Sequence, residues 1–330
     1  MRDVLATEGS DPVTETGMTA YILRRLLATI PVMVVVAVFV FFLLRMAPGD
    51  PAAIIAGEDA TAEQIAAVRG KLGLDRPIFE QFVVWIAGML QGDFGTSIFS
   101  NLPVSRLILQ RLEPTVSLTL STLLVAVCLA VPLGVLAAWS ARRLVDRLVM
   151  GFAVMGFAMP VFLVGYVLMY VFAVKLGWLP VQGYRPLAEG VGPWAECLIL
   201  PSLALGITYM ALITRITRAS MLEVLAQDYI RTADSKGLST NRVLLLHALK
   251  NASVPIVTVI GIGIALLISG VVITETVFNI PGLGRLTVDA VLKRDYPIVQ
   301  GLIIVFAAAK VLVNLIIDIS YVFLDPRIRY

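Results

Sequence analysis

The chain has 330 residues, of which 58% are hydrophobic and 15% are charged, and its formal net charge is +3. Soluble domains carry about a quarter charged residues, so this composition excludes an ordinary water-soluble protein. The excess of apolar residues falls in runs of about 20, the length that crosses a bilayer core. Helices satisfy their backbone polar groups within each span. We therefore predict an all-α integral membrane protein with several spans.

The sequence lacks the motifs of catalytic and metal-binding proteins. Its single histidine, His247, cannot form a histidine cluster alone, and Cys128 and Cys197 lie in or beside apolar runs without metal spacing. It contains no phosphate-binding G-x-x-x-x-G-K-S/T loop, no G-x-S-x-G and no H-E-x-x-H. We therefore expect no catalytic residues, no metal and no cofactor, so that any energy from ATP comes from another chain.

The N-terminal region begins with a polar tail and continues into an apolar run. Residues 1–20 are predicted to form a disordered cytoplasmic tail, because they are acidic and lack the basic start and apolar core of a cleavable signal. Two arginines then precede the apolar run 26–44, so residues 21–45 are predicted to be the first membrane span.

The next segment is too polar for a span. Residues 46–112 are predicted to form a small periplasmic insertion. Thr61 starts a helical pattern that ends before Gly73, and residues 78–90 form a second, amphipathic pattern. We expect two short helices here and not a separate enzyme domain.

Most of the remaining chain is apolar. Residues 113–325 are predicted to form a five-helix core, followed by a cytoplasmic C-terminus at 326–330. The five predicted spans of this core are residues 115–138, 148–174, 198–216, 254–274 and 298–323. Prolines in membrane helices are tolerated and either kink the helix or stand near its start. The second alternative fits Pro201 and Pro255.

The basic residues near the span ends predict the orientation. One side carries fourteen of them: Arg2, Arg24, Arg25, Arg142, Arg143, Arg147, Arg215, Arg218, Arg231, Lys236, Arg242, Lys250, Arg327 and Arg329. The short loops of the other side carry five: Lys175, Arg185, Arg285, Lys293 and Arg294. This asymmetry predicts six spans with both termini in the cytoplasm.

The most charged segment of the second half is the loop 221–253, which this orientation places in the cytoplasm. Residues 222–236 favour a helix, Gly237 suits a left-handed C-terminal cap, and Ser239 or Thr240 can start a second helix through about residue 250. The predicted apolar side of the first helix comprises Leu225, Tyr229, Ala233 and Leu238, and its polar side comprises Asp228, Arg231, Asp234 and Lys236. The segment is either a docking surface or a solvated linker.

This loop resembles the cytoplasmic coupling loop of ABC importer permeases, whose pattern is E-A-A, three residues, G, nine residues, I, any residue, L, P. The match is partial. Ala233, Gly237 and Leu249 agree with the pattern. The departures are Arg231, Thr232, His247 and Lys250.

The resemblance to one subfamily is closer and covers about residues 20–330. The motifs that carry it are DYIRTADSKGLS and HALKNA in the loop, LLRMAPGDPA, AEQIAAVRGKLGLDRP, GDFGTS, KLGWLPVQGY, ETVFNIPGLGRL, RDYPIVQG and LDPRIRY. The chain is similar to the first permease subunit of the dipeptide/oligopeptide/nickel family, the DppB or OppB type.

The resemblance implies a type I ABC importer permease fold and a pore-forming subunit for peptides or related small solutes in a bacterial inner membrane. It implies a second homologous permease subunit of the DppC or OppC type, two ABC ATPase subunits of the DppD or DppF type, and a periplasmic or lipid-anchored solute-binding protein. Membrane lipids are the remaining expected partner, and nucleic acid is not one. The residues expected to couple to an ATPase are Asp228, Tyr229, Arg231, Thr232, Ala233, Lys236, Gly237 and Leu238.

Further candidate residues lie in the spans. Lys310, Asn314 and Asp318 recur every four residues and share one helix face. Ionisable groups at membrane depth usually face a bundle interior or a wet cavity. Lys310 and Asn314 therefore either line the translocation path or belong to a structural Lys310–Asp318 network. Thr208 and Tyr209 either line the path or pack between helices.

The turn before the last span contains Phe278, Pro281 and Gly282. Proline and glycine impose a shaped turn. It acts either as a periplasmic gate or contact for the solute-binding protein, or as a packing turn.

The main alternative from another class is a stand-alone secondary transporter driven by an ion gradient. Such a protein would need paired intramembrane acids or inverted repeats. Asp318 is the only acid predicted well inside a span, and the sequence contains no repeat. An intramembrane enzyme is a third class, and its catalytic residues are missing from the sequence.

Overall fold

The computed structural model describes residues 15–46, 51–56, 60–71 and 73–324. Within these ranges the regular elements are helices, and one isolated β-bridge joins Thr96 to Pro103. The all-α prediction is therefore confirmed. Most of the predicted tail and the predicted C-terminal segment 326–330 lie outside the described residues.

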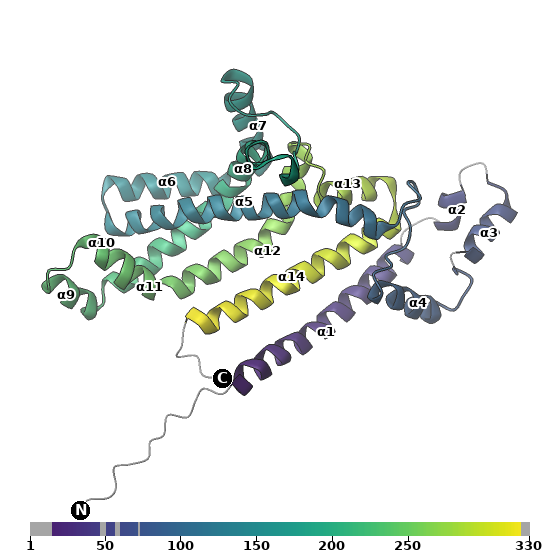
Figure 1. Cartoon of the computed structure of the whole chain (residues 1–330), viewed down its shortest axis with the longest axis horizontal. Helices are drawn as coiled ribbons and strands as arrows, with labels where there is room; N and C mark the ends of the chain where they lie inside the picture. Colours follow the sequence, from purple (N-terminus) through teal and green to yellow (C-terminus); the bar gives the residue numbers. More distant parts are fainter. Residues whose placement is uncertain (1–14, 47–50, 57–59, 72, 325–330) are drawn as a thin grey trace, which may run out of the picture.

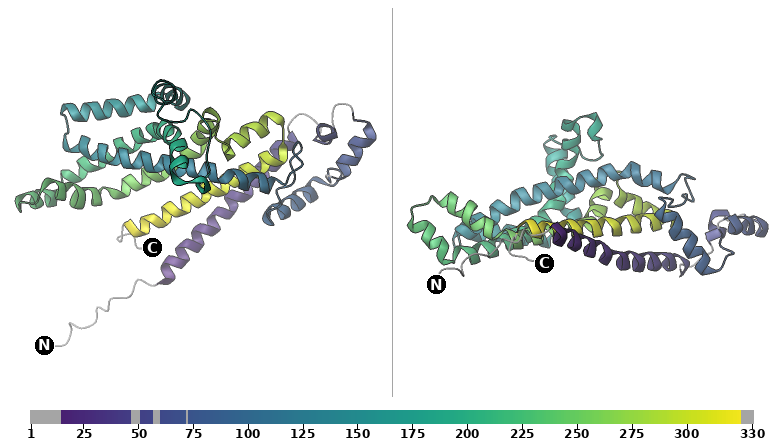
Figure 2. Two further views of the ribbon diagram at one scale, coloured as in Figure 1. Left: turned by 45° about the horizontal axis from the view of Figure 1, so that its top comes forward. Right: turned by 60° about the horizontal axis from the view of Figure 1, so that its bottom comes forward.

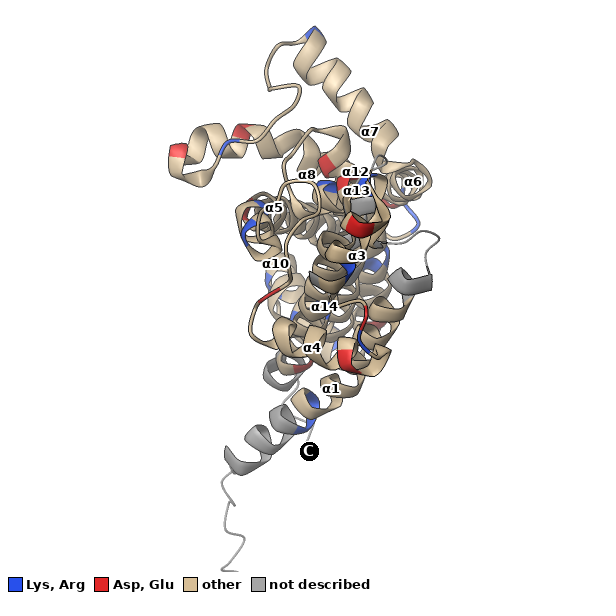
Figure 3. Cartoon of the chain, turned by 90° about the vertical axis from the view of Figure 1, so that its right-hand side faces the viewer, with Lys and Arg blue, Asp and Glu red and all other residues tan. Residues whose placement is uncertain are grey.

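Four described helices are long and apolar enough to cross a bilayer: α1 (Glu15–Met46), α5 (Val104–Trp139), α8 (Val191–Leu225) and α14 (Tyr296–Leu324). Two bent helix pairs raise the number to six if each pair is one span. One pair covers residues 144–175 and the other covers residues 240–264. Uncharged residues make up most of the ribbon (Figure 3), as hydrocarbon surroundings require.

The centre of the molecule is the pair α5 and α8, which pack along each other (Figure 1). Small residues allow the close approach: a Cβ atom on Gly134 of α5 would lie 2.5 Å from the Cβ of Thr217 in α8. Ser121 and Ser202 share a hydrogen bond of 2.7 Å between the same helices. Helix α12 (Ser253–Val277) completes this core through buried Val259, Leu267 and Val271.

The predicted span 148–174 is a bent pair of helices. It consists of α6 (Leu144–Ala158), α7 (Val161–Leu168) and the π-helix η1 (Met169–Lys175), with a bend of 107° before α7. Met159 is extended because a residue before proline avoids the helical region, and Pro160 begins the new direction. Figure 1 shows α7 leaving the body of the molecule.

The other prolines divide between the two alternatives. Pro201 lies inside α8, which begins ten residues earlier at Val191, so its predicted place near a helix start is wrong. Pro255 is the third residue of α12, as predicted. Proline at a first helical turn costs little because its missing N–H would be unpaired there anyway.

Helices α1 and α14 run side by side along one flank of the core (Figures 1 and 2). Arg25 near the start of α1 forms an ion pair of 3.2 Å with Asp318 near the end of α14. The beginning of the first span and the end of the last therefore lie together.

The insertion contains the two predicted helices, α3 (Ala62–Lys71) and α4 (Ile78–Leu90), and the unpredicted α2 (Pro51–Ala56). Thr61 and Gln64 form a reciprocal capping box at the start of α3, with distances of 2.8 and 3.3 Å between donor and acceptor. Helix α5 already begins at Val104, so residues 104–112 continue the membrane helix and do not belong to the insertion.

Two further connections contain short helices. The short 3₁₀ helix η2 (Leu187–Glu189) lies in the loop between η1 and α8. Glu113 of α5 accepts hydrogen bonds from the Leu187 N–H and the Tyr184 hydroxyl, at 2.9 and 3.1 Å. Burial, above all, raises the pKa of Tyr184. Helix α13 (Leu283–Lys293) joins α12 to α14 and was not predicted.

Candidate functional site

The cytoplasmic loop of the prediction forms a compact set of short helices at one end of the molecule, far from α2 and α3 (Figure 1). Helix α8 stops at Leu225, and α9 covers Asp228–Ser235. The single helix predicted over residues 222–236 is therefore wrong. Gln227 has an extended backbone and redirects the chain between the two helices.

The C-terminal cap predicted at Gly237 is confirmed. Gly237 has φ +75°, a left-handed conformation that favours glycine. Its N–H donates to the carbonyl of Asp234 at 2.9 Å, and the N–H of Leu238 donates to that of Ala233 at 3.4 Å. These two bonds are the Schellman motif, which satisfies the last carbonyls of a helix. These backbone hydrogen bonds therefore fix the C-terminal end of α9.

The inner face of α9 differs from the predicted apolar side. Ile230 and Ala233 are buried in a cluster with Met221 of α8 and with Val243 and Leu244 beyond the turn. Ala233 therefore packs inside this chain. This cluster fixes α9 to the end of the long helix α8.

The outer face of α9 is exposed. The side chain of Tyr229 is 45% exposed, whereas Ala233 of the same predicted apolar side is buried. The other exposed residues of the predicted coupling set are Asp228, Arg231, Thr232, Lys236 and Gly237, and Leu238 is half-buried. The Asp228–Arg231 ion pair spans 3.7 Å in solvent, where such pairs contribute little. The face presents an aromatic ring between charges of both signs.

The predicted second helix of the loop is not a regular α-helix. It consists of α10 (Thr240–Arg242), the π-helix η3 (Val243–Ala248) and α11 (Leu249–Asn251). Ser239 is its N-cap residue but makes no side-chain capping hydrogen bond. Buried Val243 and Leu244 pack in the same cluster as Ile230 and Ala233 of α9.

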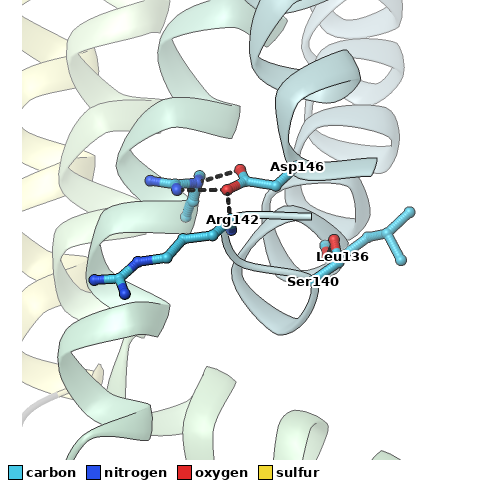
Figure 4. Close-up of polar contacts among 5 residues, drawn as sticks. Leu136, Ser140, Arg142 and Asp146 are labelled. Carbon is cyan, nitrogen blue, oxygen red and sulfur yellow. Dashed lines mark hydrogen bonds and ion pairs between the residues drawn. The ribbon is translucent and has the colours of Figure 1, made fainter. Parts of the chain in front are cut away.

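A half-buried ion pair holds the neighbouring turn to α8 (Figure 4). Asp146, in the first turn of α6, accepts bonds of 2.6 and 2.7 Å from the guanidinium of Arg218 in α8. It also accepts a bond of 2.8 Å from the N–H of Arg142, which has φ +66°. The turn before α6 and helix α9 are therefore both attached to the C-terminal part of α8.

Sequence reasoning missed this pair because it counted Arg142 and Arg218 only as orientation signals. The available signal was the acid Asp146 placed among Arg142, Arg143 and Arg147. An isolated acid among arginines at a helix start predicts a specific partner.

The other candidate residues lie elsewhere. Tyr209 is buried in the core near Gly270 of α12, an arrangement that agrees with the packing alternative. The Thr208 hydroxyl oxygen is buried and has no hydrogen-bond partner among the described residues. Both residues lie in α8 itself, several helical turns before its C-terminal end and therefore before α9.

Lys310 and Asn314 are exposed on α14. Asn314 lines a pocket of about 340 Å³ together with Arg25, Thr258 and Asp318. The alternative of a Lys310–Asp318 bridge is wrong, since Asp318 pairs with Arg25 in the part of the chain that the structure describes.

The turn with Phe278, Pro281 and Gly282 surrounds a buried carboxylate. Phe278 and Gly282 are buried, and Pro281 is exposed. Fully buried Glu275 accepts hydrogen bonds from the Thr115 hydroxyl at 2.5 Å and from the Arg285 N–H at 2.9 Å. A Cβ on Gly282 would lie 2.0 Å from a carboxylate oxygen of Glu275. Only glycine leaves room for this contact.

Sequence reasoning named the turn but missed Glu275, which precedes Phe278 in the same motif. A second buried acid, Asp295, joins two of the motifs read from the sequence. It accepts bonds of 2.6 Å from the Ser97 hydroxyl and 3.3 Å from the Ile98 N–H. The motifs GDFGTS and RDYPIVQG therefore meet in space.

The described residues contain no group of three or more His, Cys, Asp or Glu side chains placed to hold a metal ion. What the arrangement offers is mechanical: an exposed, capped helix fixed to the end of a long membrane helix. A bundle of candidate membrane spans with such a helix at one end defines a multi-pass membrane protein.

The comparisons name the family. Residues 130–330 match the family described as binding-protein-dependent transport system inner membrane component, and residues 18–119 match the N-terminal family of the same systems. The chain belongs to this family of ABC importer permeases, as its motifs predicted.

Relatives match over nearly the whole chain. A probable peptide ABC transporter permease, y4tP, of Sinorhizobium fredii is 54% identical over 313 residues, which cover 95% of this chain and 100% of the relative. The glutathione transport system permeases GsiC of Salmonella typhimurium and Escherichia coli K12 are 45% and 44% identical over the same coverage. The protein is a multi-pass inner membrane component of a transport system that depends on a solute-binding protein.

Proposed function

We propose that the chain is the pore-forming subunit of an ATP-driven importer for peptides, and that α9 transmits the motion of an ATPase to the membrane helices. The observation that carries this proposal is the exposed outer face of α9 on a helix whose end is fixed by the Gly237 cap. A partner that holds this face moves α8 with it, because Ile230 and Ala233 join α9 to Met221 of α8.

Rigidity is what the proposed coupling needs. Force applied to a flexible loop would be lost in local deformation, whereas α9 has satisfied terminal carbonyls and a buried inner face. The Asp146–Arg218 pair passes the same motion to α6. Closure of an ATPase dimer would then rotate these helices as bodies and switch the access of the pathway.

The proposed partners follow from this architecture. Two ABC ATPases of the DppD or DppF type would bind the α9 faces of this subunit and of a second permease of the DppC or OppC type. A periplasmic or lipid-anchored solute-binding protein would dock at the opposite end, where Pro281 is exposed. The start of α1, the end of α14 and α9 all lie toward the left of Figure 1, which supports a cytoplasmic location for both termini.

The substrate class is proposed from the relatives, whose names specify peptide and glutathione transport. Glutathione is itself a small peptide, so peptides and similar small solutes are the common class. Thr208, Lys310 and Asn314 are candidates for the path, since the Thr208 hydroxyl is unpaired among the described residues and the other two side chains are exposed.

The test uses Gly237 and a matched glycine. Gly177 has φ +66° and open space around its Cβ position, as Gly237 has, but it lies between η1 and α8. The complex is purified with its co-expressed partners and reconstituted, and solute uptake and ATP hydrolysis are measured. We expect Gly237→Trp to abolish ATP-driven uptake while the complex stays assembled, and Gly177→Trp to leave uptake largely unchanged.

A second variant separates backbone strain from steric obstruction. Asparagine adopts the left-handed conformation more readily than other residues, so Gly237→Asn should keep the cap and most of the activity. Normal uptake by Gly237→Trp would contradict the coupling role of this turn.

The alternative of an ion-driven secondary transporter makes a different prediction. It requires uptake by the purified chain alone, driven by an ion gradient without ATP. The pairing of Asp318 with Arg25 argues against an acid that is free to carry an ion.

A further inference from the structure

Helix α4 of the insertion is apolar yet has no buried residue. Its 13 residues include one charged side chain, Glu80, which pairs with Arg76 at 3.4 Å. Phe79 is 76% exposed and Leu90 is 84% exposed. The neighbouring helix α3 has instead a polar sequence, AEQIAAVRGK. Helices α3 and α4 of the insertion therefore differ in polarity.

One side of α4 docks on the first membrane span. Phe82 and Trp85 contact Phe41 of α1, with ring centroids 5.1 and 5.6 Å apart. Phe41 is fully buried, whereas its neighbour Phe42 remains exposed on the same span. These aromatic contacts place α4 at the end of the apolar run of α1.

Three of the exposed apolar residues of α4 form a stripe beside the docked side. Phe79, Val83 and Leu90 are separated by four and seven positions, so they share one helical face. Glu80 lies about 100° around the helix axis from Phe79. Beside the Phe41 contact, Val38, Phe39 and Phe42 of α1 are exposed as well.

The length of α4 excludes a membrane span. At about 1.5 Å per residue the helix is about 20 Å long, whereas a bilayer core is about 30 Å thick. An apolar helix of this length that is not buried in protein fits an interfacial position, and Trp and Phe prefer the boundary between headgroups and acyl chains. Continuity with the lipid-facing surface of α1 identifies the covering partner as lipid.

We propose that α4 lies in the membrane interface, with Phe79, Val83 and Leu90 inserted among the lipids of the leaflet at the C-terminal end of α1. The insertion is then anchored to the bilayer at α4, while polar α3 stands in water. This inference rests only on α1 crossing the membrane and is independent of the proposed substrate and of α9.

Spin labels in the reconstituted full chain test the proposal. Cys128 and Cys197 are replaced by serine, and single cysteines are introduced at Phe79, Val83 and Leu90. Glu80→Cys is the control within the helix, Glu63→Cys is the control for water, and Val35→Cys is the control for lipid. The protein is placed in phosphatidylethanolamine and phosphatidylglycerol nanodiscs, and label collisions with oxygen and with a water-soluble nickel chelate are compared.

We expect labels at 79, 83 and 90 to favour oxygen several-fold more than labels at 63 and 80, with a ratio approaching that at 35. Equal ratios at 79 and 63 would overturn the proposal. Poor access of both reagents to all three labels would overturn it as well, because it would show a protein covering the stripe. If the variant without cysteines does not fold, photo-crosslinking of the unmodified chain with diazirine lipids decides. Cross-links within residues 78–90 support the proposal, and their absence there, with cross-links present in α1, rejects it.

Discussion

At the α13 end, the buried acids Glu275 and Asp295 accept hydrogen bonds from Thr115 and Ser97, which are 160 and 198 positions away in sequence. At the α9 end, the charged side chains of Asp228 and Arg231 are exposed and only three positions apart. The first end uses its polar groups to join distant segments. The second leaves its polar groups exposed to solvent. The first end is therefore built for stability, and for the second we propose recognition of a partner.

The largest effect on stability is expected at Gly284 in α13. A Cβ there would lie 2.6 Å from the Cα of Val272 and 3.0 Å from a Glu275 oxygen, and a backbone atom cannot move aside easily. Gly284→Ala should cost about 3 kcal/mol of folding free energy, at the upper end for overpacking. Thermal unfolding of the purified protein should show a clearly lower Tm.

Gly192→Ala is the matched control, because a Cβ at Gly192 meets no atom within 4 Å. Surface substitutions usually change the free energy of unfolding by no more than roughly 0.5 kcal/mol. The Tm of Gly192→Ala should therefore stay within about one or two degrees of the original value. Equal effects at both glycines would refute the close-packed interpretation of the α13 end.

The next effect is expected at the ion pair between Asp146 and Arg218, near the α9 end. Asp146→Asn removes the charge that faces Arg218 and weakens two bonds of 2.6 and 2.7 Å. The expected loss is about 2 kcal/mol, the range of hydrogen bonds to charged groups, visible as a lower Tm. Asp228→Asn is the matched control in an exposed pair and should change stability by less than about 0.5 kcal/mol. A silent Asp146→Asn would show that α6 is held to α8 by apolar packing alone.

A smaller loss is expected at Ser97. Ser97→Ala removes the hydroxyl donor from buried Asp295 and the acceptor of the Ser100 N–H, but it keeps the bond from the Ile98 N–H to Asp295. The Ser100 N–H lies at an exposed residue and can bond to water, so the expected cost is that of the buried bond, about 1 kcal/mol. Exposed Ser100→Ala provides the comparison and should have no measurable effect on Tm. Identical melting curves for the two variants would mean that water replaces the Ser97 hydroxyl.

The smallest effect on stability, and a large one on transport, is expected at Tyr229. Its side chain is half exposed and outside the buried cluster, so Tyr229→Ala should shift the free energy of unfolding by at most about 0.5 kcal/mol. Uptake by the reconstituted complex should fall several-fold, and Tyr229→Phe should retain part of it. Exposed Ser235→Ala on the same helix is the control. Full uptake by Tyr229→Ala would leave the α9 face without a demonstrated partner.

The sequence was sufficient for several features that depend on neighbours along the chain. The Thr61 capping box, the Gly237 cap and the apolar runs of α1, α5 and α14 follow from local patterns. It was insufficient where two distant segments decide the outcome. The role of Glu275 depends on glycines that fold back onto it, and the break at Pro160 could not be told from a tolerated kink.

A helix in this part of the loop was predicted from the sequence, but the face that it buries was not. Ile230 and Tyr229 are adjacent, and the choice of which one is buried depends on the direction in which α8 ends and α9 restarts. The two-residue break at Ala226 and Gln227 sets the face, and local propensity does not predict it.

The Schellman cap of α9 has an evolutionary consequence. Because Gly237 and Leu238 complete the backbone hydrogen bonds of the turn within this chain, a partner only has to read side chains. Under the proposed coupling role, substitutions at Asp228, Tyr229, Arg231 or Thr232 would change which ATPase is preferred without refolding the turn. Point mutations on this single helical face would then be enough for duplicated transport systems in one cell to bind different ATPases, or to share the same one.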